Sequence, residues 1–263
     1  LDAGRLRFVG EAASRVEEDA LRMLRYCRFL PRFYGGGVDA EAMAALSVSA
    51  HLAAGLSAER VAGEMRHLLG GLGGQVGLRV MEETGLTLQA LGVSTQFDRL
   101  TPAIDRLVGM GVEDKQAAWL VRLAVIMPPS SAAILSSRLR LSRREQGTLT
   151  KLDMVSPETE FTELTGQRWR QVAYWCHREG GLPAAQLIVA AARLMRQIGE
   201  GHLAEIAFWV PPVFPLTGTA LLSHGVDKGP MVGEMLQLAE RIWVAADFGL
   251  TKDELVTRIG VGS

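Results

Sequence analysis

The sequence predicts an all-α fold of several packed helices. Ser or Thr followed three residues later by Glu recurs along the chain, and apolar residues then recur at spacings of three and four. No two segments have the alternation expected of paired strands. Apolar residues make up 48% of the 263 residues and aromatic residues only 6%, a composition that favours a substantial core of packed helices.

The first helix is expected at residues 15–33. Ser14 and Glu17 have the spacing of a capping box, which would satisfy free amides of the first turn. The acids of this segment stand in its first turns and its arginines in later turns, as the helix dipole favours. Cys27 lies on the apolar side, and the only other cysteine is Cys176. This usage indicates a reduced setting without a disulfide framework.

Later helices are expected in order along the chain. Asp39 should cap a helix that ends near Ala53, and Ser57 should cap the next, which ends at Gly70. Further helical segments are expected at residues 78–91 (interrupted at Gly85), 97–110, 113–127, 158–165, 167–178 and 182–199. The segment at 113–127 is apolar nearly all round, which predicts a central place in the core.

The second half of the chain has its own start and stop signals. Capping boxes are predicted at Ser142 with Glu145 and at Thr251 with Glu254. Prolines at residues 211–215 predict a boundary, and Pro230 is expected at the first position of a helix that runs to about residue 246. Trp169 and Trp175 are expected to be core anchors rather than platforms for stacked bases.

One acid and one arginine near the start of the chain could read a nucleotide base. An ionised Asp19 accepts hydrogen bonds and Arg22 donates them, and on one helix they would lie a turn apart. Cytosine and adenine present an amino group beside a ring-nitrogen acceptor, which complements this pair, whereas uracil and guanine present a carbonyl oxygen to the carboxylate. The alternative is a solvated face on which Glu18 and Asp19 pair with Arg22, each pair contributing about 0.2–0.5 kcal/mol.

Three ordered segments resemble the bacterial tRNA nucleotidyltransferase and poly(A) polymerase family, whose members add CCA or A to RNA 3′ ends. The first segment resembles the junction and neck of the family and contains Asp2, Gly4, Arg5, Arg7, Gly10, Arg15, Glu18, Asp19, Arg22, Arg25 and Arg28. The second is similar to the second neck helix and contains Ser57, Glu59, Arg60 and Glu64. The third resembles the tail and contains Pro215, Gly218, Gly225, Gly229, Pro230 and Glu240.

The resemblance implies the multi-helix C-terminal part of a class II RNA nucleotidyltransferase. It implies a junction and nucleotide-recognising neck at residues 1–91, a helical body at 92–210 and a helical tail at 211–263. CTP and ATP would be selected by Asp19 and Arg22, with Glu18 as a buttress and Arg15 and Arg25 as further nucleotide-binding residues. The residues expected to act as hinge or support are Asp2, Arg7, Gly10, Glu59, Arg60 and Glu64.

The expected function is RNA binding and nucleotide selection in tRNA CCA addition. Two alternatives stay open, a poly(A) polymerase of the same family and a helical interaction module without nucleotide chemistry. The net charge of −1 supplies no general attraction to nucleic acid. Contacts with RNA phosphates are therefore expected to be local, at Arg138, Arg140, Arg143, Arg144 and Lys228. Ordinary solubilising charge is the alternative for the arginines, and a helix-packing turn is the alternative for Lys228.

No catalytic residue or metal ligand is assigned in this sequence. The five histidines lack metal-site spacing, and no paired carboxylates stand in a strand context. The resemblance implies a preceding catalytic head that holds Mg²⁺, so this segment alone is expected to be inactive. No apolar run reaches the roughly 18 residues of a membrane span and no signal peptide is evident, which predicts a cytoplasmic protein. The oligomeric state stays open.

Overall fold

The computed structural model describes residues 5–33, 35, 37–111, 117–153, 168–178, 183–193, 205 and 209–260. Within these ranges all regular elements are helices, which confirms the all-α prediction. The chain forms two compact units, one of Leu1–Thr159 with Ala184–Ala207 and one of Glu160–Pro183 with Phe208–Ser263. The division into neck, body and tail stays a prediction. The expected helix at residues 158–165 and Asp2 lie outside the described residues.

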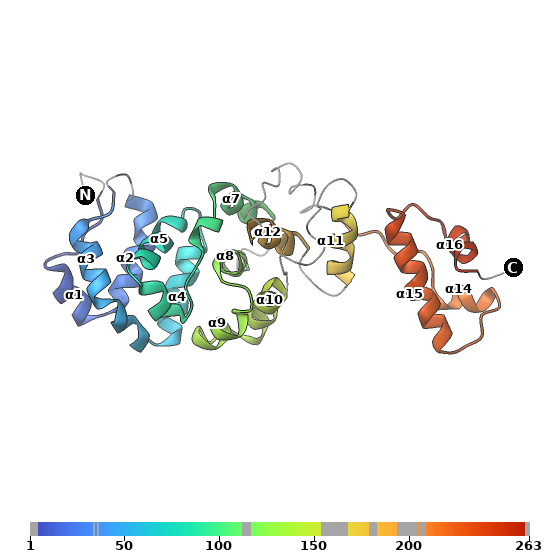
Figure 1. The fold of residues 1–263 in the computed structure, drawn as a ribbon, viewed down its shortest axis with the longest axis horizontal. Coiled ribbons are helices and arrows are strands. Elements are labelled where there is room, and N and C mark those ends of the chain that lie inside the picture. Colours follow the sequence, from blue (N-terminus) through green and yellow to red (C-terminus); the bar gives the residue numbers. More distant parts are fainter. Residues whose placement is uncertain are drawn as a thin grey trace. The chain divides into compact units, whose positions relative to one another are not determined.

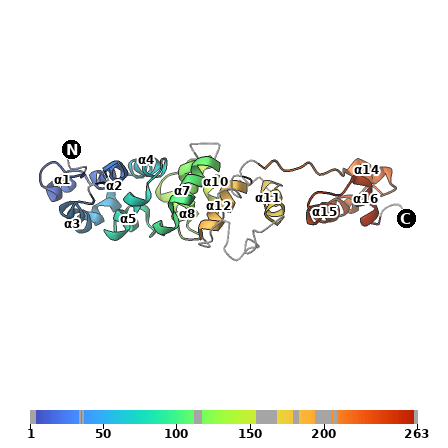
Figure 2. The same ribbon diagram turned by 90° about the horizontal axis from the view of Figure 1, so that it is seen from above.

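The first unit is a series of short helices that follow one another along the chain (Figure 1). Helix α2 packs against both α4 and α5, and α4 packs in turn against α8; Figure 2 shows the same order from above. These contacts join the start of the chain to the later helices of the unit. The elements are α1 (Ala12–Glu18), α2 (Leu21–Phe33), α3 (Ala40–Ser49), η2 (Ala50–Gly55), α4 (Ala58–Leu69), α5 (Gln75–Glu83), α6 (Leu86–Leu91), η3 (Phe97–Arg99), α7 (Pro102–Gly111), α8 (Ala118–Ile126), α9 (Ala132–Arg138), α10 (Arg143–Asp153) and α12 (Pro183–Arg193).

Helix starts with a polar cap agree with the sequence predictions. The carboxylate of Asp39 accepts the amide of Ala42 at 3.3 Å, and the hydroxyl of Ser57 accepts the amide of Arg60 at 3.4 Å. Glu145 accepts the Ser142 amide at 2.8 Å while the Ser142 hydroxyl accepts the Glu145 amide at 3.3 Å. Each cap satisfies first-turn amides that have no partner within their own helix.

The single helix predicted at residues 15–33 is wrong, because the structure breaks it into α1 and α2. Asp19 has an extended backbone, with φ −154° and ψ 103°, and its carboxylate accepts the amide of Leu21 at 3.1 Å. An Asp side chain that bonds nearby amides competes with the helix in this way. The capping box of Ser14 and Glu17 is also wrong, since the Ser14 hydroxyl donates to Glu11 at 2.9 Å and Glu11 precedes α1.

Helix α8 lies at the centre of the first unit, as its apolar composition predicts. All nine of its residues are buried, including Arg122. The Arg122 guanidinium donates to Asp105 at 2.5 Å and to the carbonyl of Leu69 at 3.2 Å. A buried charge requires such partners, because its desolvation is otherwise strongly unfavourable. The pair therefore joins α7 and α8 to the end of α4.

Aromatic side chains form the core of the second unit. Its elements are α11 (Arg168–Arg178), α14 (Gly218–Ser223), α15 (Pro230–Ala245) and α16 (Lys252–Arg258). Tyr174, Trp243 and Phe248 contact one another with ring centroids 5.1–5.7 Å apart. Trp169 is only 2% exposed, which confirms its prediction as a core residue. Such rings bury a large apolar area and fix α11 against α15.

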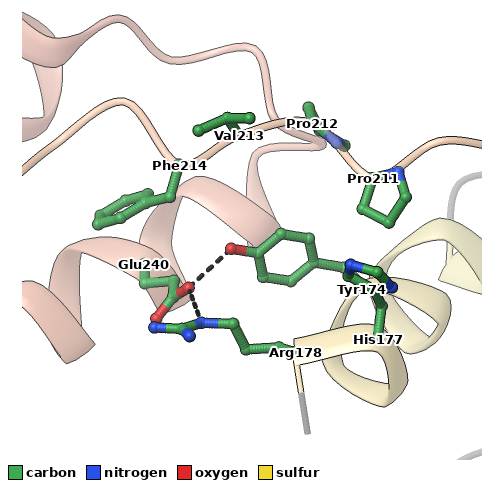
Figure 3. Close-up of a pocket in the computed structure, with 8 residues that line it drawn as sticks. All are labelled: Tyr174, His177, Arg178, Pro211, Pro212, Val213, Phe214 and Glu240. Atoms are coloured by element: carbon green, nitrogen blue, oxygen red, sulfur yellow. Dashed lines mark hydrogen bonds and ion pairs between the residues drawn. The ribbon is translucent and has the colours of Figure 1, made fainter. Parts of the chain in front are cut away.

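A hollow of about 280 Å³ lies beside this aromatic core. Figure 3 shows Tyr174 and Arg178 of α11 reaching Glu240 of α15, under residues 211–214. The Tyr174 hydroxyl donates to the Glu240 carboxylate at 2.7 Å, and Arg178 donates to the same oxygen at 3.0 Å. Burial and the adjacent carboxylate raise the pKa of Tyr174. The carboxylate of Glu240 therefore joins the two helices.

Candidate functional site

The break between α1 and α2 brings three predicted nucleotide-binding residues to one place. Glu18 ends α1, Asp19 occupies the break, and Arg22 lies in the first turn of α2. The side chains of Asp19 and Arg22 are 34% and 30% exposed. Both are therefore partly accessible to solvent and partly fixed by neighbours.

Glu18 connects the two helices across the break. One of its oxygens accepts Arg15 at 2.5 Å and Arg22 at 2.6 Å. Arg22 also donates to the backbone carbonyl of Arg15 at 2.7 Å. Hydrogen bonds from Arg22 and Arg15 hold the pKa of Glu18 below its ordinary value. Glu18 thus holds Arg22 across the break, and its role as a buttress in nucleotide binding stays a prediction.

Asp19 is held from the other side by α4. One terminal nitrogen of Arg60 donates to both oxygens of Asp19, at 2.8 and 2.9 Å. Partial burial raises the pKa of Asp19, but the Leu21 amide and Arg60, with the added charge of Arg22, lower it by more. Asp19 is therefore an ionised acceptor near neutral pH. The supporting role that the family resemblance implies for Arg60 stays a prediction.

Of the two pairs that the solvated-face alternative expects, Glu18 does bond to Arg22, whereas Asp19 and Arg22 do not bond to each other. Oδ1 of Asp19 accepts both Leu21 and Arg60, whereas Oδ2 accepts only Arg60. A carboxylate oxygen has two lone pairs, so Oδ2 retains one acceptor position. Among the described residues, Nε and Nη2 of Arg22 have no hydrogen-bond partner. One acceptor and a set of donors thus remain for a ligand.

The other residues predicted as hinge or support have contacts or backbone angles of their own. Arg7 donates to Asp39 at 2.8 Å, and Gly10 has a φ of +84°, a backbone region that glycine enters without strain. Glu64 accepts Arg28 at 2.5 Å, which ties α4 to α2. Glu59 pairs with Arg140 at 2.8 Å. Arg25 is exposed and has no partner among the described residues.

The five predicted phosphate-binding residues have different environments. Arg138 donates to the carbonyls of Leu56 and Ala53, and Arg140 pairs with Glu59. Arg143, Arg144 and Lys228 are exposed. Arg138 and Arg140 are thus engaged by contacts within the chain.

Sequence reasoning missed the carbonyl contacts of Arg138 and the link between Arg66 and Glu145, which is 3.0 Å long. Neither has a local sequence signal, because the partners are 82, 85 and 79 positions apart. The break at Asp19 did have one, since Asp is a favoured residue immediately before a helix.

Within the described ranges, no group of three or more His, Cys, Asp or Glu side chains is placed to hold a metal ion. The carboxylates of Glu18 and Asp19 are both engaged by arginines, an arrangement that does not suit a divalent cation. In the part of the chain that the structure describes, none of the helices combines the length and hydropathy of a membrane span.

Relatives match almost the whole chain. It is 36% identical over 270 residues to the CCA-adding enzyme of Latilactobacillus sakei, a match that covers 97% of this chain and 64% of the relative. It is 28% identical over 274 residues to the mitochondrial CCA tRNA nucleotidyltransferase 1 of Danio rerio, covering 97% of this chain and 58% of the relative. The chain is homologous to tRNA nucleotidyltransferases over nearly its whole length. No family model matches the sequence.

Solved structures of tRNA nucleotidyltransferases have the same fold. The Thermotoga maritima CCA-adding enzyme complexed with tRNA matches with a TM-score of 0.64 at 17% identity, over 98% of this chain and 64% of that one. The Bacillus stearothermophilus CCA-adding enzyme in complex with CTP matches with a TM-score of 0.56 at 22% identity, over 94% and 62%. The chain therefore spans less than two thirds of the length of these nucleotidyltransferases.

Proposed function

We propose that this chain is the nucleotide-selecting and RNA-binding part of a tRNA nucleotidyltransferase that adds CCA. Its substrates would be CTP and ATP, and its macromolecular partner would be tRNA. Homology to CCA-adding enzymes supports nucleotide addition to tRNA as the class of reaction. The observation that carries the assignment of the site is the open acceptor on Asp19 beside the open donors of Arg22, at the break between α1 and α2.

The chemistry of selection follows from these two groups. The free lone pair of Asp19 Oδ2 would accept the amino group of cytosine or adenine, and Arg22 would donate to the adjacent ring nitrogen. Uracil and guanine would place a carbonyl oxygen against the carboxylate, and the two acceptors would repel each other. Glu18 and Arg60 would hold the pair in place, so that little side-chain entropy is lost when a base binds.

Nucleotidyltransferases of this family typically use Mg²⁺ for phosphoryl transfer, which orients the reacting groups and stabilises developing charge. Around Asp19 the described residues do not suit such an ion. We infer that Mg²⁺ and the transfer step belong to the part of the family's enzymes that this chain does not match, and that this chain alone does not transfer nucleotides. Its own residues select the base and bind the RNA.

Nucleotide choice tests this proposal. The chain would be joined to the amino-terminal region of the Latilactobacillus sakei relative, and incorporation of each nucleotide into tRNA lacking its CCA end would be measured. Arg22→Ala and Asp19→Ala should each lower the preference for CTP over UTP about 10- to 100-fold, because a base-reading pair contributes about 1–3 kcal/mol of discrimination.

Arg32→Ala is the matched control, because Arg32 is an exposed arginine at the end of α2. It should leave nucleotide choice unchanged. Equal loss of all four incorporation rates in the Arg22 and Asp19 variants, with the preference kept, would mean that these residues support the fold only.

A further inference from the structure

Arg138, the last residue of α9, holds the loop that leads into α4. Its guanidinium donates to the carbonyl of Leu56 at 3.3 Å and to the carbonyl of Ala53 at 3.2 Å. Ala53 lies in the last turn of η2, where its carbonyl also accepts the Leu56 amide at 3.2 Å, and Leu56 is the residue that follows η2. A cation is a favoured partner there, since it also interacts favourably with the negative end of the helix dipole.

The residue after Leu56 begins the path to Asp19. Ser57 caps α4: its hydroxyl accepts the amide of Arg60 at 3.4 Å, and its carbonyl accepts the amide of Val61 at 3.1 Å. The guanidinium of Arg60 in turn holds both oxygens of Asp19. A shift of the loop before Ser57 would therefore move the start of α4 and, with it, the group that orients Asp19.

Two ion pairs extend the same connection along α4. Arg140 pairs with Glu59 in the first turn of α4, and Glu145 pairs with Arg66 in its last turn. The pair of Arg140 and Glu59 is highly exposed, at 73% and 62%, so it contributes little by itself. The contacts of Arg138 are partly buried and lie nearest to Ser57. Among these contacts, those of Arg138 carry the connection to Asp19.

We propose that Arg138 is a positioning residue for nucleotide selection, which fixes where α4 begins and thereby how Arg60 presents Asp19. This inference rests on the proposed role of Asp19 and Arg22. It replaces the contact with RNA phosphate that the basic sequence around Arg138 suggests, because the guanidinium is already engaged by two carbonyls.

The test combines backbone dynamics of this chain with nucleotide choice in the joined enzyme. Arg138→Met keeps an unbranched side chain and removes every donor, Arg138→Lys keeps one charged donor group, and Arg32→Met removes an exposed arginine as the control. Amide hydrogen exchange would be followed at Arg60 and Val61, whose bonds to Ser57 report on the start of α4.

We expect Arg138→Met to speed exchange at these two amides about 10-fold, and to lower the preference for CTP over UTP about 10-fold. A displacement of about 1 Å in a group that positions a substrate can reduce the reaction rate by roughly 100-fold, so a 10-fold loss of preference is within this range. Arg138→Lys should lie between the wild type and Arg138→Met in both measurements, and Arg32→Met should change neither. Should Arg138→Met fail to fold, the intermediate values of Arg138→Lys carry the test.

Each other result overturns the proposal. Unchanged exchange in the Arg138 variants would mean that Arg138 does not fix α4, and weaker tRNA binding alone would identify a phosphate contact. Faster exchange with an unchanged preference, while Arg22→Ala has lost its preference, would overturn the role of Arg138 and leave the proposed function intact. If Arg22→Ala also keeps its preference, the proposed function fails together with this inference.

Discussion

Arg66 of α4 and Glu145 of α10 form a hydrogen-bonded ion pair across 79 positions of sequence. Glu145 also completes the capping box of α10 with its second oxygen, which accepts both the amide and the hydroxyl of Ser142 at 2.8 Å. One carboxylate thus starts α10 and attaches it to α4. The guanidinium of Arg66 lies in turn over the ring of Trp119 of α8, 5.1 Å from its centroid.

This arrangement predicts an acid-sensitive contribution to stability. Partial burial raises the pKa of Glu145, but the hydrogen bonds from Ser142 and the charge of Arg66 lower it by more. The net result is a pKa below the ordinary value of 4.5. Because the folded pKa lies below the unfolded one, the stabilisation is complete above pH 4.5 and is lost as the pH falls through the folded pKa.

The check is the difference in free energy of urea unfolding between the wild type and Glu145→Gln. It should be constant from neutral pH to about pH 5 and shrink below that. Glu234→Gln, which changes an exposed acid of α15, should show no such trend. A difference between the wild type and Glu145→Gln that grows on acidification would contradict this account.

The buried pair of Asp105 and Arg122 predicts a larger effect. Their side chains are 7% and 3% exposed, and Asp105 also accepts the amide of Gly73 at 2.8 Å. Asp105→Ala should lower the free energy of unfolding by about 3–5 kcal/mol, because it leaves Arg122 buried without its counter-ion. Asp227→Ala, at an exposed position, should change it by no more than about 0.5 kcal/mol.

A double variant distinguishes the cost of the unpaired Arg122 charge from the loss of packing at Asp105. Asp105→Ala combined with Arg122→Met removes the unpaired charge, so it should be less destabilising than Asp105→Ala alone. Equal losses in the single and double variants would show that packing at Asp105, rather than the charge of Arg122, is the larger contribution.

The sequence predicts most of this fold because helix starts are local events. The caps at Asp39, Ser57 and Ser142 each need only three or four consecutive residues, so their signals are complete in the sequence. The break at Asp19 has a local signal in the Asp itself, but residues on both sides have helical patterns. The contact that also holds the break, from Arg60, is 41 positions away and has no local signal.

The candidate site was predicted by residue identity but not by geometry. Glu18, Asp19 and Arg22 do lie together, yet Asp19 precedes the helix that carries Arg22 and bonds to α4. The partners of Arg138 and Arg140 are 81 to 85 positions away, so a basic cluster in the sequence concealed two internal contacts. Periodicity and capping rules do not predict which distant residues a charged side chain contacts.

Gly77 of α5 predicts a packing effect with a matched control. A Cβ at this position would collide with the carbonyl oxygen of Cys27 in α2, whereas a Cβ at Gly63 of α4 has no heavy atom within 4 Å. Gly77→Ala should therefore destabilise the fold by about 1–3 kcal/mol through overpacking. Gly63→Ala should stabilise it by about 0.5–1 kcal/mol through helix propensity. Thermal unfolding of the two variants would show this opposite pair of shifts, and shifts of the same sign would contradict the close contact of α2 and α5.

The environments of the basic residues predict which of them bind RNA. Arg143 and Lys228 are exposed and have no partner among the described residues, whereas Arg138 and Arg140 are engaged within the chain. A free cation that meets a phosphate releases a counter-ion, and the logarithm of the tRNA association constant then falls with the logarithm of salt concentration by about one unit of slope per contact. We therefore expect Arg143→Ala and Lys228→Ala each to weaken tRNA binding and to reduce that slope by about one.

Arg140→Ala should change the slope less, because Arg140 would have to give up Glu59 before it could contact a phosphate. Fluorescence titrations at several salt concentrations would decide between the two groups, and equal slopes for the wild type and the Arg143 and Lys228 variants would exclude phosphate contacts at these two residues.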